Sequence, residues 1–175
     1  MIVPGLDERD ARFARLRESM GHRHLDALIV AGKGHWWTGR GYVRYLTDFH
    51  LWGHDGLILL PLDGDPSIVL NSPAVAAKIA RRGWIDDHHG DVYLSPTMTR
   101  LVQERGLHRG RIGIVGERAV IGAGVRDELR EALPDVRFER ADQLFDTVRS
   151  VKSPLELAQE RELWRLVLPA MERFQ

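Results

Sequence analysis

LILLPLDGDPSIVL, residues 57–70, predicts a β-hairpin. Two short apolar runs flank a polar turn, and Asp63-Gly64 supplies the glycine that tight hairpin turns favour. A hairpin makes two neighbouring strands antiparallel, whatever the other strands of the sheet do. This stretch therefore indicates a sheet that is not purely parallel.

Strand and helix patterns alternate on both sides of the hairpin. Further strands are expected at residues 27–31, 91–94, 111–115 and 136–139, and helices at residues 7–20 (with Asp7 as N-cap), 73–82, 96–105, 122–133 and 142–148. Residues 32–56 form a long connection, with a short helix around Tyr42–Leu46. Alternating strands and helices combined with a hairpin predict a three-layer α/β/α fold, whose middle layer is a mixed sheet of about six strands.

Residues 151–175 predict one more helix. Ser153 as N-cap, Pro154 at the first helical position and Glu156 two residues later form a capping box. An apolar stripe follows at helical spacing: Leu163, Val167, Ala170, Met171 and Phe174. Pro169 is expected to kink this helix or end it early. Because the stripe reaches the last residue without a Gly or Asn cap, we expect the chain to be a fragment of a longer polypeptide.

The composition argues against several classes of protein. Twenty-five basic and twenty-five acidic residues give a formal net charge of zero, which is not the electrostatic signature of a nucleic-acid-binding protein. The absence of cysteine excludes disulfides and thiolate chemistry. No apolar run approaches the roughly 20 residues of a membrane helix, and the first residues do not resemble a signal peptide. We therefore expect a cytoplasmic protein that binds neither nucleic acid nor membrane.

No motif in the chain forms a complete catalytic set. His50 and His54 are four residues apart, as in metal-binding helical pairs, but Gly53 weakens a helix there and no Glu follows the first His. His88-His89 reads as a polar turn before a strand. The glycine-rich stretch AGKGHWWTGRG matches no phosphate-binding fingerprint. We assign no catalytic residue and no metal ligand to this chain.

Three stretches form an ordered set of motifs along the chain. They are YLTDF (45–49) leading into GHDGLILL (53–60), RIGIVGE (111–117), and LFDTVRSVKSPLELAQERE (144–162). Together they resemble the N-terminal domain of the creatinase/prolidase/aminopeptidase P metallohydrolases, the pita-bread family. In that family an Arg-x-x-Lys-Ser-x-x-Glu segment, here the set Arg149, Lys152, Ser153 and Glu156, starts the helix that leads into the catalytic domain.

The resemblance implies both a fold and a place in a larger enzyme. Residues 1–150 would form a ribonuclease H-like N-terminal domain, and residues 151–175 would begin the linker helix to a catalytic domain absent from this chain. That domain would bind two divalent metal ions (Mn, Co or Zn) through two Asp, one His and two Glu. The parent protein would be a dimeric Xaa-Pro peptidase or a related C–N hydrolase. This chain would help it to dimerise and would shape its substrate pocket, and would be inactive and bind no cofactor alone.

The same resemblance suggests substrate-contacting residues. In creatinase an aromatic-Gly-Arg stretch before the hairpin contacts the substrate, and the matching stretch here is Trp52-Gly53-His54. We therefore expect Trp52, His54 and Asp55 to face a pocket of the partner subunit. Histidine in place of arginine removes a permanent bidentate carboxylate clamp, which puts creatine in doubt as the substrate. The preceding residues Tyr45, Leu46 and Phe49 are expected to pack onto the sheet.

Two alternatives remain open at the level of sequence. Residues 52–55 could instead be a solvated loop tip held by its own aromatic side chains. The whole chain could also be a freestanding α/β module that binds a small ligand or a protein and has no hydrolase activity.

Overall fold

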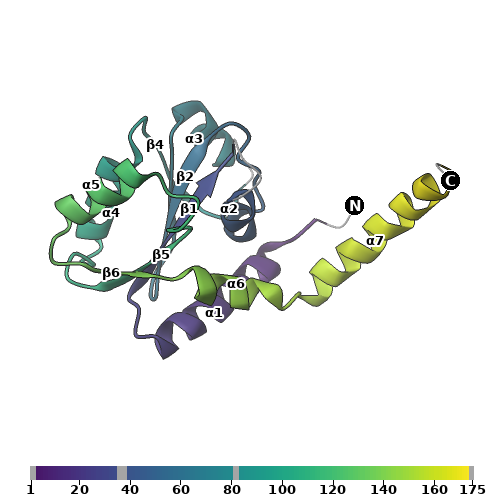
Figure 1. The fold of residues 1–175 in the computed structure, drawn as a ribbon, viewed down its shortest axis with the longest axis horizontal. Helices are drawn as coiled ribbons and strands as arrows, with labels where there is room; N and C mark the ends of the chain where they lie inside the picture. Colours follow the sequence, from purple (N-terminus) through teal and green to yellow (C-terminus); the bar gives the residue numbers. More distant parts are fainter. Residues whose placement is uncertain (1–2, 35–38, 81–82, 174–175) are drawn as a thin grey trace.

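The computed structural model describes residues 3–34, 39–80 and 83–173, and within them the strands form one six-stranded sheet in the order β4-β3-β2-β1-β5-β6 (Figure 1). The strands are β1 (Ala27–Lys33), β2 (Asp55–Pro61), β3 (Ser67–Leu70), β4 (Asp87–Gly90), β5 (Arg111–Val115) and β6 (Arg137–Arg140). The helices are α1 (Leu6–His22), α2 (Arg40–Thr47), α3 (Pro73–Ile79), α4 (Leu94–Glu104), α5 (Ala123–Ala132), α6 (Asp142–Ser150) and α7 (Pro154–Glu172). The predicted α/β class and hairpin are confirmed.

The sheet is mixed because β2 runs against all of its neighbours. β1 and β3 pair with β2 in antiparallel fashion, whereas β1 with β5, β5 with β6, and β3 with β4 are parallel. Five strands therefore end at one edge of the sheet, where β2 begins. We call this the C-terminal edge. In open α/β sheets it is the edge at which ligands usually bind.

Helices cover both faces of the sheet, as predicted. One face is covered by helices α1, α2, α3 and α6, which pack through a hydrophobic cluster that includes Leu16, Leu46 and Phe145. On the other face α4 and α5 contribute Met98 and Leu129 to a second cluster. Alternate strand residues point to opposite faces, so every buried strand contributes to both clusters. The three-layer α/β/α architecture is thus built from two cores that share one sheet.

Two local predictions are wrong. The strand expected at residues 91–94 does not form, since residues 91–93 bend and Leu94 begins α4; the real strand β4 is the polar Asp87–Gly90, which includes both adjacent histidines. Pairing with β3 decides this register, since each residue of β4 lies beside a residue of β3. The first helix begins at Leu6 after Gly5, so Asp7 lies in the first turn and is not the N-cap.

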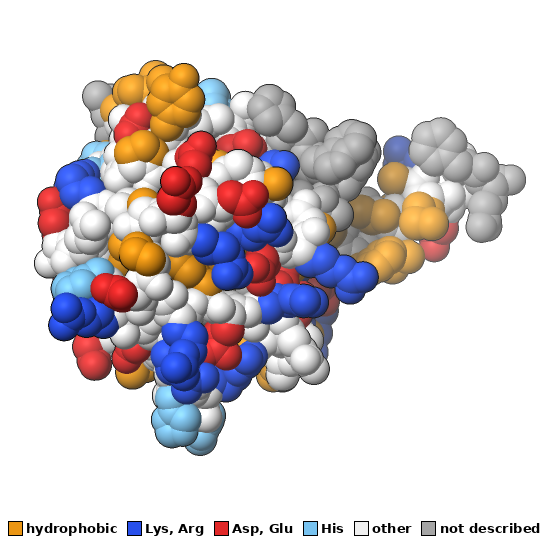
Figure 2. Space-filling model, turned by 60° about the vertical axis from the view of Figure 1, so that its left-hand side comes forward, with side chains coloured by type: hydrophobic (Ala, Val, Ile, Leu, Met, Phe, Trp, Pro, Cys, Tyr) orange, Lys and Arg blue, Asp and Glu red, His pale blue; other side chains and the backbone are white. Residues whose placement is uncertain are grey.

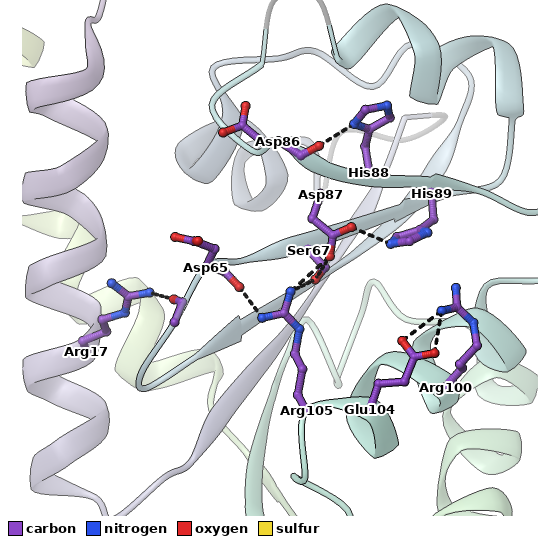
Figure 3. A network of polar contacts seen from close by, with 11 residues as sticks. Arg17, Asp65, Ser67, Asp86, Asp87, His88, His89, Arg100, Glu104 and Arg105 are labelled. Carbon is purple, nitrogen blue, oxygen red and sulfur yellow. Dashed lines mark hydrogen bonds and ion pairs between the residues drawn. The ribbon is translucent and has the colours of Figure 1, made fainter.

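Polar side chains at the opposite edge of the sheet lock the hairpin to its neighbours (Figure 3). Asp87 accepts hydrogen bonds from the Ser67 hydroxyl (2.6 Å) and from Arg105 (3.0 Å), and the His89 Nε2 lies 2.8 Å from its other oxygen. Arg105 also donates to the Asp65 carbonyl (2.6 Å). From the other layer, Arg17 donates to the Gly64 carbonyl in the turn. Arginines from both helical layers therefore hold one turn.

Helix α7 projects from the body of the domain (Figure 1). It starts with the predicted capping box and continues through Pro169 to Glu172, so the proline does not end it early. None of its described side chains is buried, and large apolar ones such as Trp164 and Leu166 are more than half exposed. Hydrophobic side chains are visible along this arm, while acidic and basic side chains intermingle on the body (Figure 2). Phe174 lies outside the described residues.

Candidate functional site

The first residues between α2 and β2 pack onto the sheet as predicted. Tyr45 and Leu46 are buried in α2, and Phe49 is partly buried against the same core, so their packing role is confirmed. Asp48 ends α2 in the left-handed region (φ +51°). The Thr47 hydroxyl bonds the Val43 carbonyl (2.8 Å) and accepts the Phe49 N–H (3.1 Å). The chain therefore leaves α2 in a defined direction.

Residues 48–54, which we call the Trp52 loop, are anchored by a side chain that sequence reasoning missed. Leu51 is only 1% exposed and belongs to the core. The loop lies directly over Gly34, whose N–H donates to the His54 carbonyl (2.7 Å). A Cβ at Gly34 would lie 2.0 Å from the Leu51 carbonyl oxygen, so only glycine fits there. The alternation of Leu51 with exposed residues was the available signal for this anchor.

Around this anchor Trp52 faces outward, whereas His54 and Asp55 are only partly exposed. The Trp52 side chain is 68% exposed, and its ring lies 6.0 Å from that of His50. Gly53 has φ +69°, which permits the chain to turn between Trp52 and His54. Residues 48–54 are not helical, so His50 and His54 do not share a helix face. The loop thus presents an exposed indole beside the exposed imidazole of His50, on a fixed base.

Asp55 lies at the C-terminal edge as the first residue of β2. Its N–H donates to the Asn71 side-chain oxygen (3.1 Å), and its carbonyl accepts the Asn71 N–H (3.0 Å). Its carboxylate oxygen Oδ1 is buried, and among the described residues it has no hydrogen-bond partner. This places a carboxylate at the edge of the sheet where β2 begins.

The same edge continues into a turn that sequence analysis assigned to a strand. Asp91 donates its N–H to Leu70 and accepts bonds from the Tyr93 N–H (3.1 Å) and the Thr97 hydroxyl (2.6 Å). The Thr97 and Tyr93 bonds lower the pKa of Asp91, because they stabilise its charged form. The turn displays Val92 (69% exposed) and Tyr93 (72% exposed). Two large apolar side chains therefore stand on a rigid turn.

The arrangement suits recognition of a ligand or partner. It combines exposed aromatic surface, an imidazole and a carboxylate at the edge where α/β folds usually bind ligands. Within the three described ranges, no group of three or more His, Asp or Glu side chains is arranged to hold a metal ion. In those ranges, too, no helix is long and apolar enough to cross a bilayer.

Comparisons with known proteins agree with this architecture. A sequence model of the creatinase/prolidase N-terminal domain matches residues 12–151. Among curated proteins, the ectoine hydrolase of Halomonas elongata is 25% identical over 178 residues, a match that covers 92% of this chain and 42% of the relative. The chain thus spans about two fifths of the length of that enzyme.

Solved structures share the fold. The N-terminal domain of the cytoplasmic peptidase PepQ from Mycobacterium tuberculosis H37Rv superposes with a TM-score of 0.62 at 19% identity, covering 79% of this chain and 98% of that one. A prolidase from Thermococcus sibiricus gives a TM-score of 0.72 at 15% identity, covering 94% of this chain and 43% of that one. At such identities the likeness establishes the fold alone.

Proposed function

The chain belongs to the creatinase/prolidase N-terminal domain family, and on that basis we propose that it is the non-catalytic N-terminal part of a dinuclear-metal hydrolase. The parent enzyme cleaves Xaa-Pro peptides or a related C–N bond. The observation that carries the proposal is the family match over residues 12–151, together with relatives more than twice as long as the matched segment. The boundary between this domain and the linker helix lies at about residue 150.

In this proposal the metal centre lies in a catalytic domain that is not part of this chain. Two divalent ions would be held by side chains of that domain and would supply Lewis-acid activation of the water that hydrolyses the substrate. This chain contributes side chains that bind and orient the substrate, and its aromatic surface keeps water away from one side of it.

Trp52, His54 and Asp55 are the residues proposed to make these contacts, across a homodimer. The exposed indole of Trp52 supplies a flat apolar wall, and the His54 imidazole supplies a hydrogen-bonding group. The carboxylate of Asp55, the first residue of β2, is proposed to accept a hydrogen bond from a substrate or from the partner subunit. Leu51 and Gly34 support this proposal because they fix the loop, so its exposed side chains need little ordering on binding.

The substrate class is tested by hydrolysis assays with two kinds of substrate. The full-length gene product should hydrolyse either Xaa-Pro dipeptides or ectoine, the compound for which a relative is named, and should require a divalent metal. Residues 1–175 alone, assayed in parallel at the same concentration, should be inactive toward both. An in-frame stop codon directly after Gln175, or full hydrolase activity in residues 1–175, would contradict the proposal.

A further inference from the structure

Arg12 of α1 is a buried charged side chain, with 5% of its surface exposed, that joins three elements. It donates to Glu8 within α1 (2.8 Å), to the Tyr45 carbonyl at the end of α2 (2.9 Å) and to Glu156 at the start of α7 (3.2 Å). Its guanidinium carbon also lies 4.6 Å from the centre of the Tyr45 ring. A planar group with several fixed donors can make all these contacts at once, whereas a lysine cannot.

The two carboxylate oxygens of Glu156 have different roles: one caps the N-terminus of α7, and the other binds Arg12. Oε2 accepts the Ser153 N–H (2.9 Å), and the Ser153 hydroxyl accepts the Glu156 N–H (3.1 Å), which completes the capping box. Oε1 takes the bond from Arg12. Because none of the described side chains of α7 is buried, packing holds the helix only weakly. Its direction depends on polar contacts near its first turn.

Two other arginines fasten the corner between α6 and α7. Arg15 donates to the Val151 carbonyl and to the Tyr45 hydroxyl, both at 3.1 Å. Arg149 stacks over the Tyr42 ring, with 5.3 Å between its guanidinium carbon and the ring centre. In the linker motif, Arg149 therefore contacts α2 and Glu156 contacts α1. The motif residues join the start of α7 to the body of the domain.

We propose that Arg12 and Glu156 form a positioning pair that sets the direction of α7 relative to α2 and the Trp52 loop. One guanidinium holds both the Tyr45 carbonyl, shortly before the loop, and the first turn of α7. A domain joined to α7 is thereby placed against the loop. This last step rests on the proposed function, whereas the direction of α7 rests on the contacts of this chain alone.

Site-directed spin labels can test the pair directly because the chain has no cysteine. Glu131→Cys on α5 and Leu166→Cys on α7 place labels at exposed positions on the body and on the arm. Leu166 lies about 15 Å along the helix from Glu156, so a swing of about 20° moves it by about 5 Å. Pulsed electron resonance on residues 1–175 should give one narrow distance distribution.

Two variants should broaden that distribution by several ångströms. Arg12→Met leaves Glu156 without its buried partner, and Glu156→Gln removes the charge while a glutamine at this position can still complete the capping box. Arg100→Met, which removes the exposed α4 pair with Glu104, is the matched control and should change nothing.

A second label pair on the body, Lys78→Cys with Glu131→Cys, reports whether each variant keeps its fold. If Arg12→Met also disturbs the body, Glu156→Gln alone decides. A narrow, unshifted α7 distance in a variant with a normal body would overturn the positioning pair. Because the distance is measured on this chain, that failure is separate from any failure to find hydrolase activity.

Discussion

Truncating Trp52 in the full-length enzyme should weaken catalysis and leave the stability of this domain almost unchanged. The side chain is 68% exposed, so Trp52→Ala should alter the free energy of unfolding by about 1 kcal/mol or less. His54→Ala removes a proposed hydrogen bond to the substrate. Losing such a bond should raise the activation barrier by roughly 1–3 kcal/mol, which lowers kcat/KM about tenfold to a hundredfold.

The neighbouring residue offers a matched control. Leu51 is 1% exposed and anchors the same loop, so Leu51→Ala should destabilise the protein by about 2–5 kcal/mol. Thermal melts of residues 1–175 carrying each change can resolve the difference, because about 1 kcal/mol shifts Tm by roughly 2–4 °C in a chain of this size. Adjacent residues of one loop should thus differ in stability, with a large loss in Leu51→Ala and almost none in Trp52→Ala.

Steady-state kinetics beside thermal melts on all three variants would decide the role of the loop. If Trp52→Ala and His54→Ala fold normally and keep the parent kcat/KM, the loop is a solvated surface and its proposed contact with substrate is refuted. If Trp52→Ala lowers Tm as much as Leu51→Ala does, the exposed placement of the indole is refuted instead.

Three further outcomes follow from the structure. Burial raises the pKa of Asp87, but hydrogen bonds from Ser67 and Arg105 and the charge of His89 outweigh it, so the pKa is lower in the folded than in the unfolded protein. Between these two pKa values the unfolded state binds more protons, so the free energy of unfolding should fall as pH drops below about 4. Asp87→Asn should show a smaller loss in the same unfolding experiments. Gly34→Ala should lower Tm markedly, because its Cβ would clash with the Leu51 carbonyl, whereas Ala at the exposed Gly124 should not. Amide exchange should be fastest in α7, and uniformly slow exchange along it in a monomer would contradict this.

Much of the fold follows from local sequence patterns. The hairpin, the buried strands β1 and β5 and the capping box of α7 each carry a strong local signal, and the structure confirms all of them. Strand β4 does not, because Asp87–Gly90 is polar and gains strand geometry only from pairing with β3. The more strand-like residues 91–94 were misread because the side-chain bonds of Asp91 bend the chain at residues 91–93 and Leu94 begins α4.

The candidate site was partly accessible from sequence. The resemblance to creatinase directed attention to Trp52, and its side chain is exposed in the structure. Arg12 could not be expected as a joint, because its partners Tyr45 and Glu156 are remote in sequence and only the tertiary fold brings them together. Tyr93 was missed as a surface residue because it was placed in a strand.

Parallel calorimetric titrations of Mn²⁺ into residues 1–175 and into the full-length product test the central claim most directly. Described residues of this chain hold no cluster of three or more potential ligands, and the proposal places the dinuclear centre in the catalytic domain. The account predicts two sites in the full-length protein and no site tighter than about micromolar in residues 1–175. A stoichiometric tight site in residues 1–175, or no metal binding by the full-length protein, would contradict it.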